Sequence, residues 1–190
     1  MRRKSPDDGG ISEVFGVMLV LTVTLIVACL VAVFVGGFSF GAEEQAISAN
    51  LVASGLYVDE SKDCAYILFE HVSGDPVDLN SIVFSLGLRS SAKNTTHIQN
   101  TDKPTGKDEN GGSLTHYIQN YGAPDKTKKI AVGDRLVLYA DGADNDGIYW
   151  QKEGAPAKFF APWNDYITYQ ILDTRSNRPI SSGKIPVSGP

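Results

Sequence analysis

Residues 14–40 read VFGVMLVLTVTLIVACLVAVFVGGFSF, and this stretch divides the chain into two chemically different parts. None of its 27 residues is Asp, Glu, Lys, Arg or His, and most are Val, Leu, Ile, Phe or Ala. A helix needs about 20 apolar residues to cross the core of a bilayer. A helix that is apolar on every side does not suit the surface of a globular domain. The stretch therefore predicts a helix surrounded by lipid or by other apolar helices.

The part of the chain after this stretch has the mixed composition of a single soluble domain. It contains about 150 residues, a size at which a domain builds its own core. Short runs of β-branched and aromatic residues alternate with polar ones and are separated by Gly, Pro, Asn and Asp, which is typical of strands and turns. Seven predicted strands cover residues 65–72, 81–88, 113–119, 135–140, 147–152, 166–172 and 179–187.

These elements predict an α+β fold, with a long N-terminal hydrophobic α-helix followed by an antiparallel β-sandwich or barrel. Asp173 to Arg178 reads as a polar hairpin loop between the last two strands, and Val132-Gly133-Asp134 as the turn before strand 135–140. The paired glycines Gly36 and Gly37 predict a bend between helix and domain, because each costs about 1 kcal/mol relative to Ala in a helix.

The ten residues at the N-terminus, MRRKSPDDGG, are interpreted as part of a targeting signal. Positive charge at Arg2, Arg3 and Lys4 favours the cytoplasmic side of a membrane and directs the rest of the chain outward. An ordinary secretory signal is cut after a hydrophobic run of 7–15 residues, and this run is far longer. Three interpretations stay open from the residues alone: a permanent anchor, conventional cleavage after the run, and cleavage before the helix.

The segment GGISEVFGVML, residues 9–19, resembles the start of archaeal type IV pilins. In that family a membrane peptidase cuts before the helix, so the hydrophobic segment remains in the mature protein. The resemblance implies a leader at residues 1–9, a polymerisation and transmembrane helix at 10–50 and an extracellular β-rich domain at 51–190. Gly9-Gly10 replaces the basic residue often found before the cut and Phe15 replaces the usual Ile or Val, so the predicted scissile bond is Gly9-Gly10 or Gly10-Ile11.

The resemblance also implies a function and a set of partners. The chain is expected to be a structural subunit of a pilus-like filament, a homopolymer of identical subunits with roles in adhesion or surface attachment. Its expected partners are the prepilin peptidase, the membrane assembly machinery and, before assembly, the membrane itself. The alternatives are a minor adhesive pilin, a membrane-anchored extracellular binding domain or enzyme, and an archaeal motility-filament subunit.

Five residues are predicted to act in assembly: Ser12, Glu13, Gly16, Gly36 and Gly37. Ser12 suits the N-cap of the helix. The glycines either let neighbouring backbones approach closely or reflect the ordinary composition of transmembrane helices. A carboxylate at the edge of an apolar helix needs a positive partner. Cleavage creates one, so Glu13 is expected to compensate the new α-amino group of a neighbouring subunit. The alternative is that Glu13 favours the positive end of its own helix dipole.

Two polar segments of the outer domain suggest further sites. Asn94-Thr95-Thr96 is an N-x-T glycosylation acceptor in a polar stretch expected to be a loop. Asp141, Asp144 and Asp146 offer hard oxygen ligands for Ca²⁺, but their spacing departs from the EF-hand pattern and Asp, Asn and Gly also favour turns. The aromatic residues Trp150, Trp163, Tyr166 and Tyr169 are expected in the core or an interface, with carbohydrate binding as the alternative.

Several function classes find no support in the sequence. The net charge of −5 argues against a nucleic-acid surface, which depends on clustered Lys and Arg. No nucleophile elbow, phosphate loop or H-E-x-x-H motif is present, so neither catalysis nor a cofactor is expected. Cys29 and Cys64 lie in different environments and are expected to be free thiols.

Overall fold

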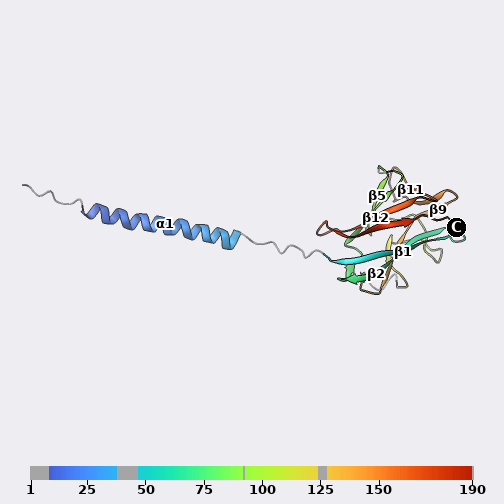
Figure 1. Cartoon of the computed structure of the whole chain (residues 1–190), viewed down its shortest axis with the longest axis horizontal. Helices are drawn as coiled ribbons and strands as arrows, with labels where there is room; N and C mark the ends of the chain where they lie inside the picture. Colours follow the sequence, from blue (N-terminus) through green and yellow to red (C-terminus); the bar gives the residue numbers. More distant parts are fainter. Residues whose placement is uncertain (1–8, 38–46, 92, 124–127, 190) are drawn as a thin grey trace, which may run out of the picture. The chain divides into compact units, whose positions relative to one another are not determined.

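The computed structural model describes residues 9–37, 47–91, 93–123 and 128–189, and Figure 1 shows their helix and strands in sequence colours. The chain divides into two compact units, Met1–Glu43 and Glu44–Pro190. The first contains helix α1, Gly9–Gly37, and the second contains all the strands. Each unit is described by itself below.

Helix α1 confirms the predicted apolar helix. Its 29 residues correspond to roughly 43 Å at 1.5 Å per residue. Residues 14–32 form a span apolar enough to cross a membrane. The helix predicted beyond Gly37, up to residue 46, lies outside the described residues. Residues 49 and 50, assigned to the helical segment from sequence, belong instead to the first strand.

Two four-stranded antiparallel sheets form most of the second unit. The first has the order β1-β2-β8-β6 and the second β13-β12-β4-β5. A three-stranded sheet, β11-β10-β9, and a two-stranded ribbon, β3-β7, complete it. The bounds are β1 Ala49–Asp59, β2 Cys64–Gly74, β3 Val77–Asp78, β4 Ile82–Leu88, β5 Thr95–Ile98, β6 Ile118–Asn120, β7 Lys129–Ile130, β8 Arg135–Tyr139, β9 Gly142–Asp144, β10 Gly147–Trp150, β11 Phe159–Pro162, β12 Tyr166–Asp173 and β13 Pro179–Pro186.

The core lies between the two larger sheets. Phe69 of β2 contacts Phe84 of β4 and Tyr169 of β12, with both pairs of ring centroids 5.0 Å apart. Trp150 of the three-stranded sheet belongs to the same cluster. In the part of the chain that the structure describes, the sheets stay open at their edges. The α+β fold and the sandwich are therefore confirmed, and the barrel alternative is not.

Strand β12 follows the period-two pattern that predicted it most clearly. Along β12, buried and more exposed residues alternate from Tyr166 to Asp173. The strand predicted at 113–119 begins only at Ile118, because in this stretch Ile118–Asn120 alone pairs with β8. Strand β5 lies inside the stretch expected to be a polar loop, and β11 was not predicted at all. These short strands pair with β4 and β10, and neither carries enough alternation of its own to identify it.

The largest error is β1, an 11-residue strand that the sequence did not predict. Its register with β2 shifts between Ala53 and Gly55, which is a bulge. Before the bulge Leu51 and Ala53 contact the core, and after it Leu56 and Val58 do. One extra residue moves the inward positions from odd to even numbers, so the alternation that identifies a strand is interrupted.

The predicted hairpin loop between β12 and β13 is confirmed, and Asp173 organises it. Its buried carboxylate accepts hydrogen bonds from Ser176 Oγ at 2.8 Å, Ser176 N at 3.3 Å and Arg175 N at 3.4 Å. Burial raises the pKa of Asp173, but the bonds from Ser176 and Arg175 outweigh it, so the pKa lies below its ordinary value of 3.8. The predicted turn at Val132-Gly133-Asp134 is also present, with Gly133 at a φ of 92° and Asp134 N donating to Ala131 O.

Replacing Asp173 with Asn is expected to reduce the free energy of unfolding by about 1–3 kcal/mol at pH 7. A lowered folded-state pKa gives stability that is complete above the unfolded pKa and is lost as pH falls through the folded pKa. The difference between the two proteins should therefore shrink below about pH 4. Urea unfolding of the full chain in detergent, followed by Trp fluorescence, measures it. A difference that is constant from pH 7 to pH 2 would contradict the assigned role.

Candidate functional site

The surface of α1 is the first candidate site. Every side chain from Val14 to Ala32 is exposed, and none of this span is buried within the structure. Phe15 is 71% exposed and Leu25 64%, although buried Leu and Phe side chains each gain about 1.5–3 kcal/mol. Exposure of this helix to water is therefore unfavourable, and the described residues of its own chain do not shield it from water.

The threonine hydroxyls of this span form hydrogen bonds within the helix. Thr22 Oγ1 donates to the carbonyl oxygens of Met18 and Leu19 at 2.8 and 3.0 Å, and Thr24 Oγ1 donates to Leu21 O at 2.9 Å. An unsatisfied hydroxyl in lipid costs several kcal/mol, so these bonds make the helix compatible with an apolar surrounding. A Cβ added at Gly16 would have no described heavy atom within 4 Å. The space beside this glycine therefore allows another backbone to approach.

Asp141, the first of the calcium candidates, has a structural role. Its Oδ1 accepts from Thr105 N at 2.6 Å, Gly106 N at 3.0 Å and Thr105 Oγ1 at 3.1 Å. Its Oδ2 accepts from Tyr117 Oη and Gln151 N, both at 2.6 Å. Burial, with the bond to Asp141 second, raises the pKa of Tyr117, so its hydroxyl stays a proton donor. One buried carboxylate thus joins three segments that are distant in sequence.

The structure does not bring the three calcium candidates together as ligands. Asp144 pairs with Lys158 at 3.4 Å and accepts from Asp146 N at 3.2 Å, a bond typical of a tight Asp turn. Among the residues that the structure describes, no three Asp, Glu, His or Cys side chains are grouped to hold a metal ion. For residues 141–147, the turn interpretation therefore agrees with the structure better than the calcium-ligand interpretation does.

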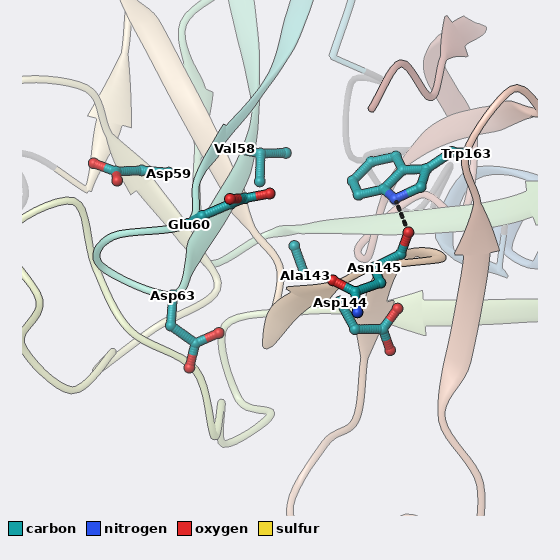
Figure 2. Close-up of a pocket in the computed structure, with 8 residues that line it drawn as sticks. All are labelled: Val58, Asp59, Glu60, Asp63, Ala143, Asp144, Asn145 and Trp163. Carbon is teal, nitrogen blue, oxygen red and sulfur yellow. Dashed lines mark hydrogen bonds between the residues drawn. The ribbon is translucent and has the colours of Figure 1, made fainter. Parts of the chain in front are cut away.

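An acidic cleft of about 230 Å³ lies beside this turn (Figure 2). It is lined by Val58, Asp59, Glu60, Asp63, Ala143, Asp144, Asn145 and Trp163. Asp59 pairs with Lys62 at 3.5 Å and Asp63 with Lys107 at 3.4 Å, and Trp163 Nε1 donates to Asn145 O at 3.0 Å. Ion pairs thus hold three of the four carboxylates, Asp144 included, as is usual for a solvated acidic surface.

The aromatic residues of the late region do not form one site. Trp150 and Tyr169 are buried in the core, and Trp150 Nε1 donates to Tyr139 O at 2.8 Å. Tyr166 is 41% exposed on β12, where the Arg89 guanidinium lies 5.8 Å from its ring centroid. Trp163 is partly buried and packs against the same core, so core packing, the interpretation favoured from sequence, accounts for three of the four residues.

A different aromatic group, which the sequence did not reveal, lies on the outer face of the first sheet. Tyr57 of β1 is directly opposite Tyr66 of β2, and Tyr66 is opposite Tyr139 of β8. The ring centroids are 5.3 and 5.7 Å apart. We refer to these three side chains as the tyrosine row. No sequence pattern joins residues so far apart, so only strand register could have identified them.

Asn94, the candidate glycosylation site, lies in the turn before β5. Its backbone N donates to Ser91 O at 3.1 Å, and the residue is half-buried. The following residues Thr95 and Thr96 already belong to β5. Modification of Asn94 stays a prediction.

Comparison with known families bears on α1. Residues 9–51 match the family described as archaeal type IV pilin, N-terminal. This segment is similar to the N-terminal domain of archaeal type IV pilins. It includes the whole of α1 and the first three residues of β1, so the resemblance seen in residues 9–19 is confirmed.

Two further proteins are similar to this chain. An uncharacterized protein of Archaeoglobus fulgidus is 36% identical over 83 residues, which are 43% of this chain and 55% of the relative. The chain thus spans about half the length of that relative. The archaellum periplasmic stator protein FlaG from Sulfolobus acidocaldarius covers 72% of this chain and 99% of its own, at 11% identity and a TM-score of 0.41. A TM-score of this size does not establish a shared fold.

The processing residues of the pilin segment lie at the start of α1. Gly9, Gly10 and Ile11 are all helical, and both candidate scissile bonds are therefore inside the helix. Two consecutive glycines weaken a helix by about 1 kcal/mol each, at this end as at Gly36-Gly37. The side chains of residues 9–13 and 33–37 lie outside the described part. Because α1 begins at Gly9, Ser12 lies inside the helix and the predicted N-cap at Ser12 is wrong. The assembly roles of Ser12, Glu13, Gly36 and Gly37 stay predictions.

Replacing Asp141 with Asn is expected to lower the free energy of unfolding by about 2–4 kcal/mol, because five donors would lose a charged acceptor. Asp144→Asn, at an exposed ion pair, is the control and should cost less than about 1 kcal/mol. Chemical unfolding of the full chain in detergent checks both. EDTA should leave the unfolding midpoint of the unmodified chain unchanged, and stabilisation by Ca²⁺ that is lost in Asp141→Asn would contradict the structural role.

Proposed function

We propose that this chain is a structural subunit of an archaeal type IV pilus-like filament and polymerises through α1. The observation that supports this role most directly is the uncovered apolar surface from Val14 to Ala32, in a segment that matches archaeal pilins. A helix of this kind needs an apolar surrounding both before and after assembly. Lipid supplies it first, and copies of the same helix supply it in the filament.

Exchange of lipid for protein gains little hydrophobic free energy, because lipid tails are as apolar as Leu. Close van der Waals packing has to drive the association of the helices instead. Gly16 leaves room for a neighbouring backbone, and Ala32 and Ala28 are small positions about one and two turns before Gly36. The hydroxyls of Thr22 and Thr24 are bonded within their own helix, so they make no demand on a partner.

The proposed maturation follows from the same helix. A membrane peptidase removes residues 1–9 or 1–10, the assembly machinery takes the subunit from the membrane, and the β-rich domain is displayed outside the cell. The new α-amino group lies close in sequence to Glu13. In a core of packed apolar helices, a carboxylate and an ammonium group stabilise each other only as a pair. We therefore propose that Glu13 of one subunit meets the N-terminus of its neighbour and fixes the register.

The proposed role is structural and needs no catalytic centre. Adhesion or surface attachment is the proposed use of the displayed domain, and the exposed ring of Tyr57 supports a surface that meets other molecules. Glycosylation of Asn94 fits the same extracellular location.

Leu21→Asp separates anchoring from assembly. Fifteen Val, Leu, Ile and Phe residues between positions 14 and 35 favour insertion by roughly 4–9 kcal/mol, and one Asp at the centre costs about 2.5–3.5 kcal/mol. The variant should therefore still insert into the membrane. In a helix core an unpaired charge is not tolerated, so sheared filaments should fall at least about tenfold.

The measurement is made in cells that lack their own copy of the gene, by carbonate extraction and by the yield of sheared filaments. Leu21→Ala is the matched control and should keep both insertion and filaments. Filaments of Leu21→Asp at the yield of the unmodified chain would contradict assembly through α1. Recovery of the exported chain as a soluble monomer without residues 11–40 would overturn the proposal as a whole.

Glu13→Gln tests the pairing with the new N-terminus. The variant should be processed normally, because its backbone and size are unchanged, but its filaments should be reduced by about tenfold or more, since the α-amino group loses its counter-charge. Mass analysis of the N-terminal peptide and filament yield are measured on the same cells. Glu13→Asp keeps the charge and should assemble better than Glu13→Gln. Equal filament yields for Gln and Glu would favour the helix-dipole alternative.

A further inference from the structure

Tyr57 is held as an exposed aromatic platform at one end of the tyrosine row. Its side chain belongs to a residue that is 46% exposed, whereas Tyr139 at the other end is 4% exposed. Tyr57 stacks on Tyr66 with an angle of 21° between the ring planes. Its ring also packs over Gly55, where a Cβ would lie 3.5 Å from Cε2. Because contacts on two sides fix the ring, little conformational entropy would be lost when a ligand stacks on it.

The bulge in β1 gives Tyr57 this orientation. After the bulge Leu56 and Val58 pack against the core, so Tyr57 between them has to face outward. The neighbouring part of the same sheet face is covered, because Leu114 packs with Leu68, Val137 and Tyr139 in a second apolar cluster. This apolar cluster does not extend to β1. A cleft is therefore left between β1 and the segment that contains Glu109 and Asn110.

This cleft has a volume of about 360 Å³ and is lined by Tyr57, Val58, Asp59, Lys62, Cys64, Tyr66, Glu109 and Asn110. Its volume falls at the lower end of the range for small-molecule sites. Lys62 is already engaged, since its Nζ donates to Glu109 O at 2.7 Å and pairs with Asp59. Asp59 also accepts from Ser61 N at 3.1 Å. The side-chain amide of Asn110 and the carboxylate of Glu109 make no hydrogen bond within the described residues, so they are available to a ligand.

The charges around the cleft select against anions. Burial first, and then the negative charges of Asp108, Glu109 and Asp59, raise the pKa of the Cys64 thiol to about 11. Burial, followed by neighbouring groups that include Glu109, raises the pKa of Tyr66 to about 12, so its hydroxyl remains a proton donor at neutral pH. The cleft thus offers one apolar ring face, neutral donors and carboxylate acceptors in a negative field.

We propose that this cleft binds a neutral hexopyranose, stacked with its C–H face on Tyr57. A pyranose ring presents an apolar face of C–H groups and a rim of hydroxyls, each of which donates and accepts hydrogen bonds. Tyr57 matches the face, and the Asn110 amide, the Glu109 carboxylate and the Tyr66 hydroxyl match the rim. A sulfated or carboxylated sugar would meet the carboxylates of Asp59 and Glu109 and bind more weakly.

The test uses the full chain in a detergent without a sugar headgroup, with saturation-transfer NMR against methyl glycosides. The probes are methyl β-galactoside, methyl β-glucoside, methyl α-mannoside and methyl β-N-acetylglucosaminide, with galactose 6-sulfate as the anionic comparison. At least one neutral glycoside should receive saturation at its ring C–H protons, and more than the sulfated sugar does. Tyr57→Ala should reduce its association constant by about tenfold.

Two matched variants separate recognition from folding. Tyr57→Phe keeps the ring and should retain binding within about threefold, while Tyr166→Ala removes a similarly exposed tyrosine from the other sheet and should leave binding unchanged. Near-UV circular dichroism checks that all three variants remain folded. Absence of saturation for every neutral glycoside would overturn the proposal, and so would equal binding by Tyr57→Ala and Tyr166→Ala. Filament yield of Tyr57→Ala should equal that of the unmodified chain, because the cleft lies outside α1.

Discussion

An apolar helix that nothing in the described part of its own chain covers is the constraint on which the rest of the molecule depends. Val14 to Ala32 expose side chains that water does not solvate favourably, and the helix satisfies its own threonine hydroxyls. Only lipid or other apolar helices complete its environment. On the proposed function the surroundings of the helix change between membrane and filament, so the second unit has to be stable without help from the first.

The second unit meets that requirement through its own core and one buried carboxylate. Phe69 contacts side chains of the facing sheet, and the core cluster extends to the three-stranded sheet through Trp150. Asp141 then fixes the long loops that the sheets leave uncovered, since its five hydrogen bonds come from three distant segments. A charge in this position is costly alone, and the number of donors makes it favourable. The contacts of this core and of Asp141 all lie within the second unit.

Sequence was sufficient wherever a local pattern carried the information. The absence of charge in residues 14–40 predicted α1, and clean alternation predicted β2, β4 and β12. It failed at β1, because the bulge after Ala53 exchanges inward and outward positions within one strand. Asp141 could be interpreted only as a turn residue or a ligand, since its donors are up to 36 residues away along the chain. The tyrosine row was equally hidden, because register across three strands brings its members together.

Substitutions on the two faces of the β1-β2-β8-β6 sheet differ in how much they destabilise the domain. Exposed residues of the outer face can therefore serve recognition without affecting folding. Truncation of an inward residue such as Phe69 to Ala costs about 3–5 kcal/mol, a large part of the stability of a domain of this size. Replacement of an exposed outward residue such as Tyr57 changes stability by about 0.5 kcal/mol. Exposed positions of the outer face, such as Tyr57, are therefore free to change, while the inner face, the second apolar cluster and α1 are not. On the proposed function, such a subunit can alter its surface chemistry without altering the helix through which it assembles.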